Sequence, residues 1–385
     1  MATTTPVFPL LLLLFAAAVV AVPPSPYLSP TTLFQNYQNM LTNFKIFIYT
    51  PAKPFTFQNP AASLFYSSLL YSPFHTQDPN EAHLFFIPFS PETSMRSLAR
   101  LVRDLRVNHP YWNRTLGADH FFVSPAGIDY SADRNVLELK KNSVQISVFP
   151  VISGNFIPHK DITLPPLNPA ARIISAVPEN ASTSSFLGYL KWDGKTESNF
   201  VEELKEDGDF LIDIERELLD HVEKVKNSKF CLLLHAGDVA WMVEAMAMGC
   251  IPVVIVDRPI QDLPLMDVLR WSDLGLLVEA RGGAKRLKQV LNDVSEEKYG
   301  VMREMTSAAS KHLVWNEETQ PLDVFHMICK KQLESSQSIH LRWHMIPVTK
   351  PLKIAKSATR IILKSVFAPE IDCCNYIGTR FKPAK

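Results

Sequence analysis

The chain has 385 residues, of which 46% are hydrophobic and 20% are charged, so it can bury the cores of two ordinary domains and is not a disordered chain. Lys plus Arg and Asp plus Glu are 39 each, which gives a formal net charge of +0. This balance leaves no basic stripe for nucleic acid, and we find no zinc-finger or RNA-binding motif, so we expect no nucleic-acid partner.

An uninterrupted apolar run, Leu10 to Val22, stands near the amino terminus. It is short for a full membrane span, and it could be either an anchor or the core of a cleaved signal peptide, for which Val19-Val20-Ala21 offers a small-residue cleavage pattern. We expect an anchor and stem over residues 1–25. Either alternative places the remainder in the secretory lumen, and N-glycosylation sequons at Asn113 and Asn180 fit that compartment.

Residues 40–175 alternate short apolar runs with helical patterns. Ser94 to Val107 is predicted to be an amphipathic helix, because apolar side chains recur on one side and arginines on the other. Four strands are expected, at Phe44–Tyr49, Leu84–Pro88, His120–Val123 and Val144–Phe149. This alternation predicts a parallel sheet with helices on both faces. The proline-rich stretch Pro158 to Pro178 is predicted to be a linker.

Residues 182–335 repeat the alternation. Outside the central segment, the expected strands and helices are Ser185–Tyr189, Ser198–Lys205, Glu215–Asn227, Leu274–Val278 and Ala284–Val294. The predicted fold class is therefore α/β, with two doubly wound, Rossmann-like domains. Residues 336–385 form a tail with two apolar clusters and many basic residues, to which the pattern assigns no structure.

The most informative segment is Ser228 to Trp271. A buried strand, Phe230–Leu234, is followed by the turn His235–Asp238, a helix, Val239–Met248, and a second buried strand, Ile251–Val256. Strand, loop, helix and strand form a parallel crossover unit. The loop lies at the carboxyl end of the first strand, where helix amides point at a ligand.

The chain has five cysteines, and their spacing does not match a zinc site. Cys231 and Cys250 fall at strand positions and are predicted to be buried in the core. An odd count leaves at least one thiol unpaired in a monomer, and the spacing leaves the pairing open.

Several motifs, in this order, resemble the exostosin-like glycosyltransferases of family 47, especially the plant members that build cell-wall polysaccharides. In the first half they are Asp78–Phe89 and Pro110–Val123. In the second half they are Ser228–Leu232, Glu244-Ala245, Gly249–Val254 and Val268–Trp271. The resemblance covers roughly Phe44 to Cys329.

The resemblance implies two domains facing a cleft, the GT-B type of fold, and a hexosyl or pentosyl transfer. The donor would be a UDP-sugar and the acceptor a cell-wall polysaccharide, with inversion of configuration and no cofactor or metal ion. It also implies a single-pass type II protein of the Golgi membrane, held by its N-terminal helix with the catalytic part lumenal, and other Golgi glycosyltransferases as possible partners.

Six residues of the crossover unit are expected on the donor side. Glu244 is an acid inside an apolar helix and needs a partner, and the resemblance implies that this partner is the donor ribose. Gly237 and the helix N-cap Asp238 would shape the loop against the diphosphate. Asp257, which ends its predicted strand, and Asp262 could line the same cleft, and His235 could contact the donor phosphates. The alternative for Glu244 is an acid that is exposed or paired with a nearby basic side chain. The alternative for Gly237 is a purely structural turn.

An inverting transfer needs a base that takes the proton of the acceptor hydroxyl. Asp119 and His120, at the start of an expected strand, are the candidates. The sequence leaves open whether this pair is catalytic or holds the strand in place.

The sequence departs from the family at two expected arginines. The loop before Glu244 carries Val239-Ala240-Trp241 where similar enzymes have Ser-x-Arg, and Tyr189 stands where relatives have Arg after Phe-x-Gly. Arginine is the natural partner of a diphosphate, so the phosphates would be left to backbone amides and to His235, Lys191 or Lys195. The alternative function is therefore a catalytically impaired relative that serves as a partner or scaffold in a Golgi polysaccharide synthase complex.

Other enzyme classes find less support. A metal-dependent sugar transferase would need an Asp-x-Asp at a strand end, and the one such triplet, Asp207-Gly208-Asp209, lies in an acidic run typical of an exposed turn. No Gly-x-Ser-x-Gly elbow indicates an esterase, and no phosphate-binding loop motif indicates an NTPase.

Overall fold

The structure is a computed structural model. It describes residues 25–51, 53–152, 154–167, 185–192, 199–213, 218–235, 237, 239–257, 259–260, 262–332 and 334. The apolar run 10–22, Asn180, Lys195, Asp238 and the tail 336–385 lie outside these residues. Within the described part, no helix is both long enough and apolar enough to cross a membrane.

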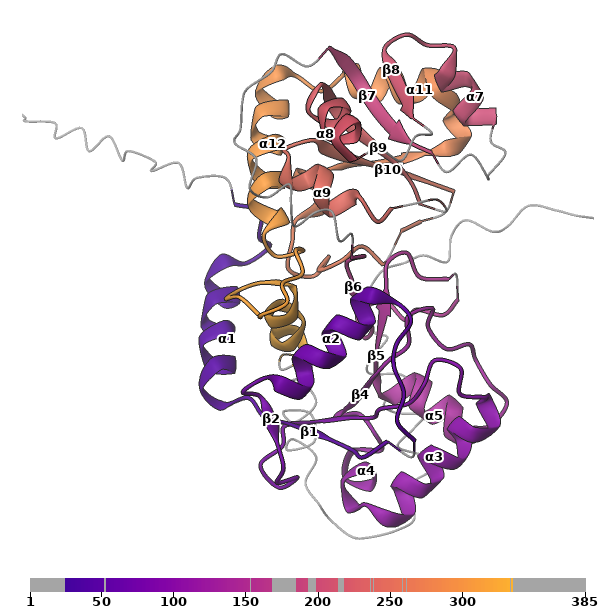
Figure 1. Cartoon of the computed structure of the whole chain (residues 1–385), viewed down its shortest axis with the longest axis vertical. Helices are drawn as coiled ribbons and strands as arrows, with labels where there is room; N and C mark the ends of the chain where they lie inside the picture. Colours follow the sequence, from indigo (N-terminus) through magenta and orange to yellow (C-terminus); the bar gives the residue numbers. More distant parts are fainter. Residues whose placement is uncertain are drawn as a thin grey trace, which may run out of the picture. The chain divides into compact units, whose positions relative to one another are not determined.

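The first half of the chain builds a parallel sheet of six short strands (Figure 1). They are β1 (Ile46–Ile48), β2 (His75–Thr76), β3 (Leu84–Phe86), β4 (His120–Val123), β5 (Val144–Val148) and β6 (Ile162–Leu164), in the order β2-β1-β3-β4-β5-β6. The helices are α1 (Pro30–Asn43), α2 (Pro60–Tyr71), α3 (Met95–Asn108), α4 (Pro110–Thr115) and α5 (Arg134–Asn142). Strands β3 to β6 are buried along their whole length, as expected when helices cover both faces of a parallel sheet.

Polar side chains fix where three of these helices begin. The side chain of Asn59 accepts a hydrogen bond from the Ala62 amide at the start of α2, and the Ser94 hydroxyl accepts one from Ser97 at the start of α3. Asp133 caps α5 in the same way. Each cap satisfies an amide that has no partner inside its helix, and such a cap contributes about 1 kcal/mol.

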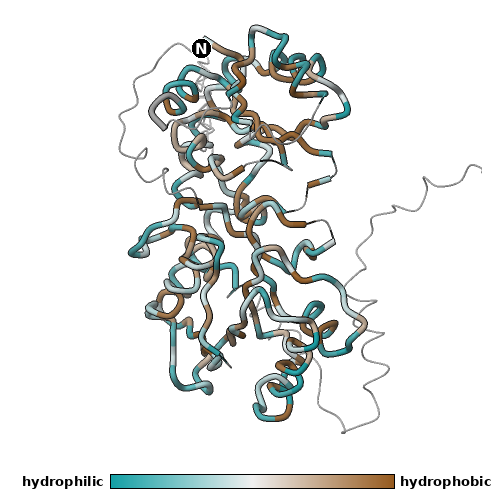
Figure 2. Tube along the Cα trace, turned by 45° about the vertical axis from the view of Figure 1, so that its right-hand side comes forward, coloured by the Kyte–Doolittle hydropathy of each residue, from teal (hydrophilic) through white to brown (hydrophobic). Residues whose placement is uncertain are grey.

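The second half builds a parallel sheet of five strands, in the order β11-β10-β9-β7-β8. They are β7 (Phe186–Lys191), β8 (Phe210–Asp213), β9 (Ser228–Leu234), β10 (Ile251–Val256) and β11 (Leu276–Glu279). The helices are α7 (Asn199–Lys205), α8 (Leu218–Lys226), α9 (Met242–Ala247), α10 (Trp271–Leu274), η1 (Ala280–Gly282), α11 (Gly283–Asn292) and α12 (Glu296–Ser310). Strands β9 and β10 are almost entirely buried, and hydrophilic stretches lie along the outer coils of the trace (Figure 2).

The two ends of the described chain contact the half that is distant from them in sequence. Tyr27 forms an isolated bridge with Leu269, and the Trp315 indole donates a hydrogen bond to the Pro165 carbonyl at 3.0 Å. One buried hydrophobic cluster includes residues of both halves. The described part of the chain therefore shares a core across the two sheets.

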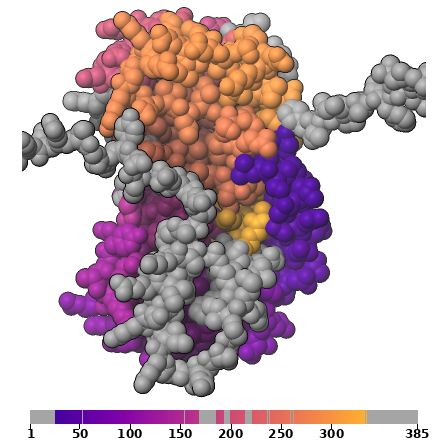
Figure 3. Space-filling view, turned by 180° about the vertical axis from the view of Figure 1, so that it is seen from behind, coloured from indigo at the N-terminus to yellow at the C-terminus, as the bar shows by residue number. Residues whose placement is uncertain are grey.

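A helical segment at residues 324–332 lies beside α1 (Figure 3). The Tyr37 ring of α1 meets His326 edge-on with centroids 6.0 Å apart, and Asn36 donates a hydrogen bond to Glu334. Residues separated by almost 300 positions are thus packed together.

The elements agree with the sequence predictions in type, with three differences. The predicted linker contains β6, because Ile162–Leu164 pairs with β5 at the edge of the first sheet. The helix expected from Val239 begins at Met242, since the chain first makes a turn in which the Met242 amide donates to the Val239 carbonyl. Helices α1, α2, α4, α5, α10 and α12 and strands β2 and β8 were not predicted. In α1, the buried side chains Leu33, Tyr37 and Met40 recur at helical spacing among polar residues.

Candidate functional site

The strand orders place a topological switch point in each sheet. In the second half the chain runs from β7 outward to β8 and returns to β9 on the other side of β7, so connections leave this edge in opposite directions. The same occurs between β1 and β3 in the first half. Ligands of open parallel sheets bind outside the carboxyl ends of the strands at such points.

His235 directly follows β9, next to the switch point, as expected from the sequence. Its amide donates a hydrogen bond to the Ile255 carbonyl at 3.0 Å, which continues the pairing with β10. Its Nε2 lies 3.4 Å from Oδ1 of Asp262, and both side chains are buried. The imidazole therefore lies at the carboxyl edge of the sheet, beside a buried carboxylate.

The carboxyl ends of one strand from each sheet meet at this point. The Phe149 ring, which follows β5, contacts the His235 ring edge-on with centroids 5.6 Å apart. The next residues of that loop also take part, because the Val151 amide donates a hydrogen bond to Oδ2 of Asp262 at 2.8 Å. Asp262 therefore contacts His235 with one oxygen and the other half of the chain with the second.

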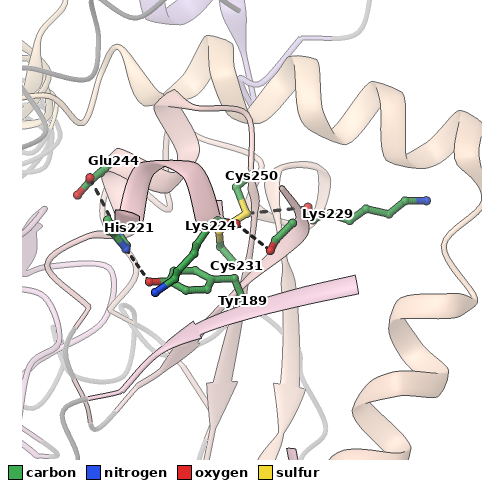
Figure 4. Close-up of a disulfide and its surroundings, with 8 residues drawn as sticks. Tyr189, His221, Lys224, Lys229, Cys231, Glu244 and Cys250 are labelled. Atoms are coloured by element: carbon green, nitrogen blue, oxygen red, sulfur yellow. Dashed lines mark hydrogen bonds and ion pairs between the residues drawn. A yellow bond between two sulfur atoms is a disulfide. The ribbon is translucent and has the colours of Figure 1, made fainter. Parts of the chain in front are cut away.

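Glu244, the predicted ribose ligand, lies on α9 and is completely buried. Its Oε1 is 3.6 Å from Nε2 of His221 on α8. The other imidazole nitrogen, Nδ1, is 2.7 Å from the Tyr189 hydroxyl, which also donates a hydrogen bond to Asp213 at 3.1 Å (Figure 4). The acid thus pairs with a nearby base, which is one of the alternatives that the sequence left open.

These three contacting polar side chains connect three elements of the second half. Tyr189 comes from β7, His221 from α8 and Glu244 from α9, and the Trp241 ring packs edge-on against both Tyr189 and His221. Lys224 pairs with Asp213 at 3.1 Å. A donor hydroxyl can reach the Glu244 carboxylate only by displacing a neighbour of this acid, because the residue has no exposed surface.

A disulfide joins Cys231 in β9 to Cys250 at the entry of β10, 19 residues later (Figure 4). Both cysteines are buried, which confirms that prediction, and the pairing was not predicted. Tyr189 is the register partner of Cys231, so the disulfide lies beside the Tyr189–His221–Glu244 chain. Cys329 is a buried free thiol, and burial raises its pKa.

Asp119 and His120 are also completely buried, at the amino end of β4. The His120 Nδ1 is 2.7 Å from Asp119 Oδ1, and its Nε2 is 3.0 Å from the Tyr49 hydroxyl. Thr115 and Arg114 donate further hydrogen bonds to Asp119. Both nitrogens of the imidazole are therefore engaged by protein groups.

The titration of this pair follows from its burial. Burial alone would raise the pKa of the Asp119 carboxyl, but hydrogen bonds from His120, Thr115 and Arg114 outweigh it, and the pKa lies below 3.8. Burial lowers the pKa of His120 below 6.5, against the opposing effect of Asp119. A neutral His120 donates from Nδ1 to Asp119 and accepts at Nε2 from Tyr49. Its lone pair is then occupied, which favours the structural alternative over general-base catalysis.

The remaining predicted residues are spread over the surface. Gly237 is half-buried in a turn in which its amide donates to the Leu234 carbonyl at 2.8 Å. Asp257 ends β10 and is exposed, and Lys191 ends β7. Asn113 is exposed on α4. Of these, Gly237 lies closest in sequence to His235.

Three partners were missed by the sequence reasoning: Tyr49, Tyr189 and His221. The position of His221 carried a signal, because it stands one helical turn before Val225, which is also buried, on the predicted helix. Tyr189 lies in β7 and Tyr49 directly follows β1, and their hydroxyl partners come from elsewhere in the chain.

Among the described residues, no group of three or more His, Cys, Asp and Glu side chains has an arrangement suited to a metal ion. Asp207 and Asp209 of the single Asp-x-Asp triplet both pair with Lys288 on α11, at 2.8 and 2.7 Å. The triplet lies in the turn between α7 and β8, as expected.

A model of the exostosin GT47 domain matches residues 40–294. The chain belongs to the exostosin GT47 family. The two parallel-sheet α/β halves agree with the two doubly wound domains that were predicted from the sequence.

Individual relatives agree with this family. A probable glycosyltransferase of Arabidopsis thaliana is 27% identical over 338 residues, which cover 78% of this chain and 69% of the relative. A probable beta-1,4-xylosyltransferase of the same plant is 28% identical over 321 residues, which cover 71% and 75%. Among solved structures, MurG of Acinetobacter baumannii is 11% identical and covers 73% of this chain and 77% of its own, with a TM-score of 0.30.

Proposed function

We propose that this exostosin-family chain transfers a sugar from a UDP-sugar to a growing cell-wall polysaccharide, with inversion of configuration and without a metal ion. Family membership supports the glycosyl transfer, and the names of the relatives support a polysaccharide acceptor. The observation that carries the proposal is the contact of Phe149, after β5, with His235, after β9. It brings together the carboxyl edges of two doubly wound sheets, where the donor and the acceptor would each bind.

Within this site, His235 and the backbone of Gly237 would face the donor diphosphate, and Glu244 the ribose. The His235 Nε2 lies 3.4 Å from Oδ1 of Asp262, so a carboxylate of the same half lies against the imidazole. The Glu244 carboxylate is oriented by His221 and would accept hydrogen bonds from ribose hydroxyls once a neighbour moves aside. Asp238 and Asp257 belong to the same loops and remain predictions.

A second candidate function is a non-catalytic partner or scaffold of a polysaccharide synthase complex. The first observation that favours it is that Tyr189 stands where relatives have a phosphate-binding arginine. The Tyr189 hydroxyl instead forms a buried hydrogen bond with His221. The second is that Glu244 and His120, two of the residues with an expected chemical role, are fully buried.

A donor-hydrolysis screen separates the two functions. The full-length protein is incubated with a panel of UDP-sugars, with and without EDTA, and UDP release is measured. We expect release from at least one donor, at the same rate with EDTA. Absence of both UDP release and UDP binding would favour the scaffold, whereas release that EDTA abolishes would overturn only the metal-free part.

We further propose that the chain is a single-pass type II protein of the Golgi membrane, anchored through Leu10–Val22 with the described residues in the lumen. The apolar run and the sequons at Asn113 and Asn180 support this proposal. Carbonate extraction of microsomes should leave the protein in the membrane pellet. Its release into the supernatant would show instead that the run is a cleaved signal peptide.

A further inference from the structure

Helix α3 carries a row of arginines on its solvent side. Arg96, Arg100 and Arg103 stand at i, i+4 and i+7, so they share one face of the helix and all are exposed. The opposite face buries Leu98 and Val102 against the first half's core. The helix is thus anchored on one side and presents three guanidinium groups on the other.

This face is one wall of a groove of about 400 Å³. Helix α3 packs beside α5 (Figure 1), and the other wall consists of Ser131 and Asp133 from the loop before α5 and Asn135 from its first turn. Met95 and Ala99 add apolar atoms between the arginines. The groove therefore combines cationic, hydroxyl and small apolar surface.

The charge of the groove is largely uncompensated. Arg106, on the same helix but outside the groove, is held by Glu138 at 2.6 Å. By contrast, Arg96 and Arg100 form no ion pair with any residue that the structure describes, and Arg103 is 4.0 Å from the exposed Asp104. The Asp133 carboxylate faces the α5 amides and accepts hydrogen bonds from Asn135 and Val136. Three guanidinium groups thus face one carboxylate that already has partners.

We propose that this groove binds a carboxylate-bearing polysaccharide, such as a chain of uronic acids. Guanidinium groups bind carboxylates through two parallel hydrogen bonds. Their spacing along the helix axis, about 6 Å from Arg96 to Arg100 and about 4.5 Å from Arg100 to Arg103, suits charges repeated along a polymer better than one small anion. The Ser131 hydroxyl and the apolar atoms of Met95 match sugar hydroxyls and ring faces. The proposal rests on the proposed function only in taking the polymer to be a polysaccharide.

The test is a calorimetric titration of oligogalacturonate into the full-length protein at low salt. We expect Arg96→Gln combined with Arg100→Gln to weaken binding roughly tenfold or more, because each charge-assisted hydrogen bond is strong. The matched control is Arg286→Gln, which removes an exposed arginine on α11 and should leave binding unchanged. Added salt should weaken binding by the wild-type protein, since the arginines are exposed.

Three results would overturn the proposal. The first is that the double variant binds oligogalacturonate as tightly as the wild type does. The second is that the wild type binds the carboxyl-reduced, neutral oligomer as tightly as oligogalacturonate. The third is that single-stranded DNA or anionic lipid vesicles bind as tightly as oligogalacturonate and depend equally on these arginines. UDP titration of the same double variant distinguishes this groove from the donor site. If the double variant still binds UDP but no longer binds oligogalacturonate, both sites are supported. If the wild type does not bind UDP at all, only the proposed function is contradicted.

Discussion

His221 lies between Tyr189 and Glu244, with its Nε2 3.6 Å from the Glu244 carboxylate and its Nδ1 2.7 Å from the Tyr189 hydroxyl. All three side chains are buried, and the Cys231–Cys250 disulfide lies beside them. The imidazole therefore lies between the Tyr189 hydroxyl and the one acid in α9. Because buried polar groups are stable only with their partners, a change in any member should be felt by the others.

Replacement of Glu244 by Gln should weaken UDP binding by about 1.5–3 kcal/mol, the range for hydrogen bonds to charged groups. Gln keeps the shape of the side chain and its contact with His221, so the melting temperature should change little. Calorimetric titration of UDP beside melting curves measures both. Glu297→Gln, an exposed acid on α12, is the control and should alter neither quantity. Unchanged affinity in Glu244→Gln would remove this residue from the donor site.

Replacement of Cys231 and Cys250 by Ala should lower the free energy of unfolding by about 3 kcal/mol, because the disulfide closes a loop of 19 residues. Urea denaturation of the double variant and the wild type gives this value. Peptide mapping without reduction should recover the two cysteines as one linked pair. Recovery of both as free thiols in the native protein would contradict the pairing.

The free energy of unfolding should decrease as the pH falls below 6.5. Burial lowers the folded-state pKa of His120 and of His312, so between the folded and unfolded pKa values the unfolded chain binds more protons. The contribution of these imidazoles is fully present above 6.5 and is lost as the pH falls through their folded pKa values. Asp119, whose pKa lies below 3.8, adds a loss at still lower pH. Urea titrations from pH 8 to pH 5 measure the trend, and a flat profile in both the wild type and His312→Gln would contradict it.

Replacement of His120 by Gln should lower the melting temperature while donor hydrolysis per folded molecule is retained. The ring bonds Asp119 and Tyr49 and stacks on Phe85 with centroids 5.0 Å apart, so its loss removes several buried contacts. An exposed histidine serves as the control, and His159→Asn should leave both quantities unchanged. Lost hydrolysis with an unchanged melting temperature would instead identify His120 as catalytic.

Much of the fold could be predicted because its signals are local. The strand Ile251–Val256 was predicted residue for residue, since its six apolar residues follow the helix breaker Gly249 and Cys250, and Gly249 indeed has a left-handed φ of 75°. Helix α1 was missed, because its three buried side chains are diluted by polar ones and pack against residues far along the chain. The same holds for β6, whose three residues become a strand only by pairing with β5.

The candidate site was harder to predict because its contacts are tertiary. That Glu244 would need a partner follows from its apolar helix, but the partner, His221, lies on another helix. Asp119 and His120 stand out as adjacent polar residues. The Tyr49 hydroxyl, which forms a hydrogen bond with Nε2 of His120, instead comes from the residue directly after β1. The contact between Asp262 and Val151 spans 111 residues and depends on how the two sheets meet.

The central claim is that this chain extends a polysaccharide with a sugar from a UDP-sugar. The most direct test is incubation of the full-length protein with a panel of UDP-sugars and cell-wall oligosaccharides, followed by mass spectrometry of the acceptors. The account predicts products longer by one sugar residue for at least one donor and acceptor pair, with release of UDP. Acceptors of unchanged mass throughout, together with no UDP binding in calorimetry, would contradict it.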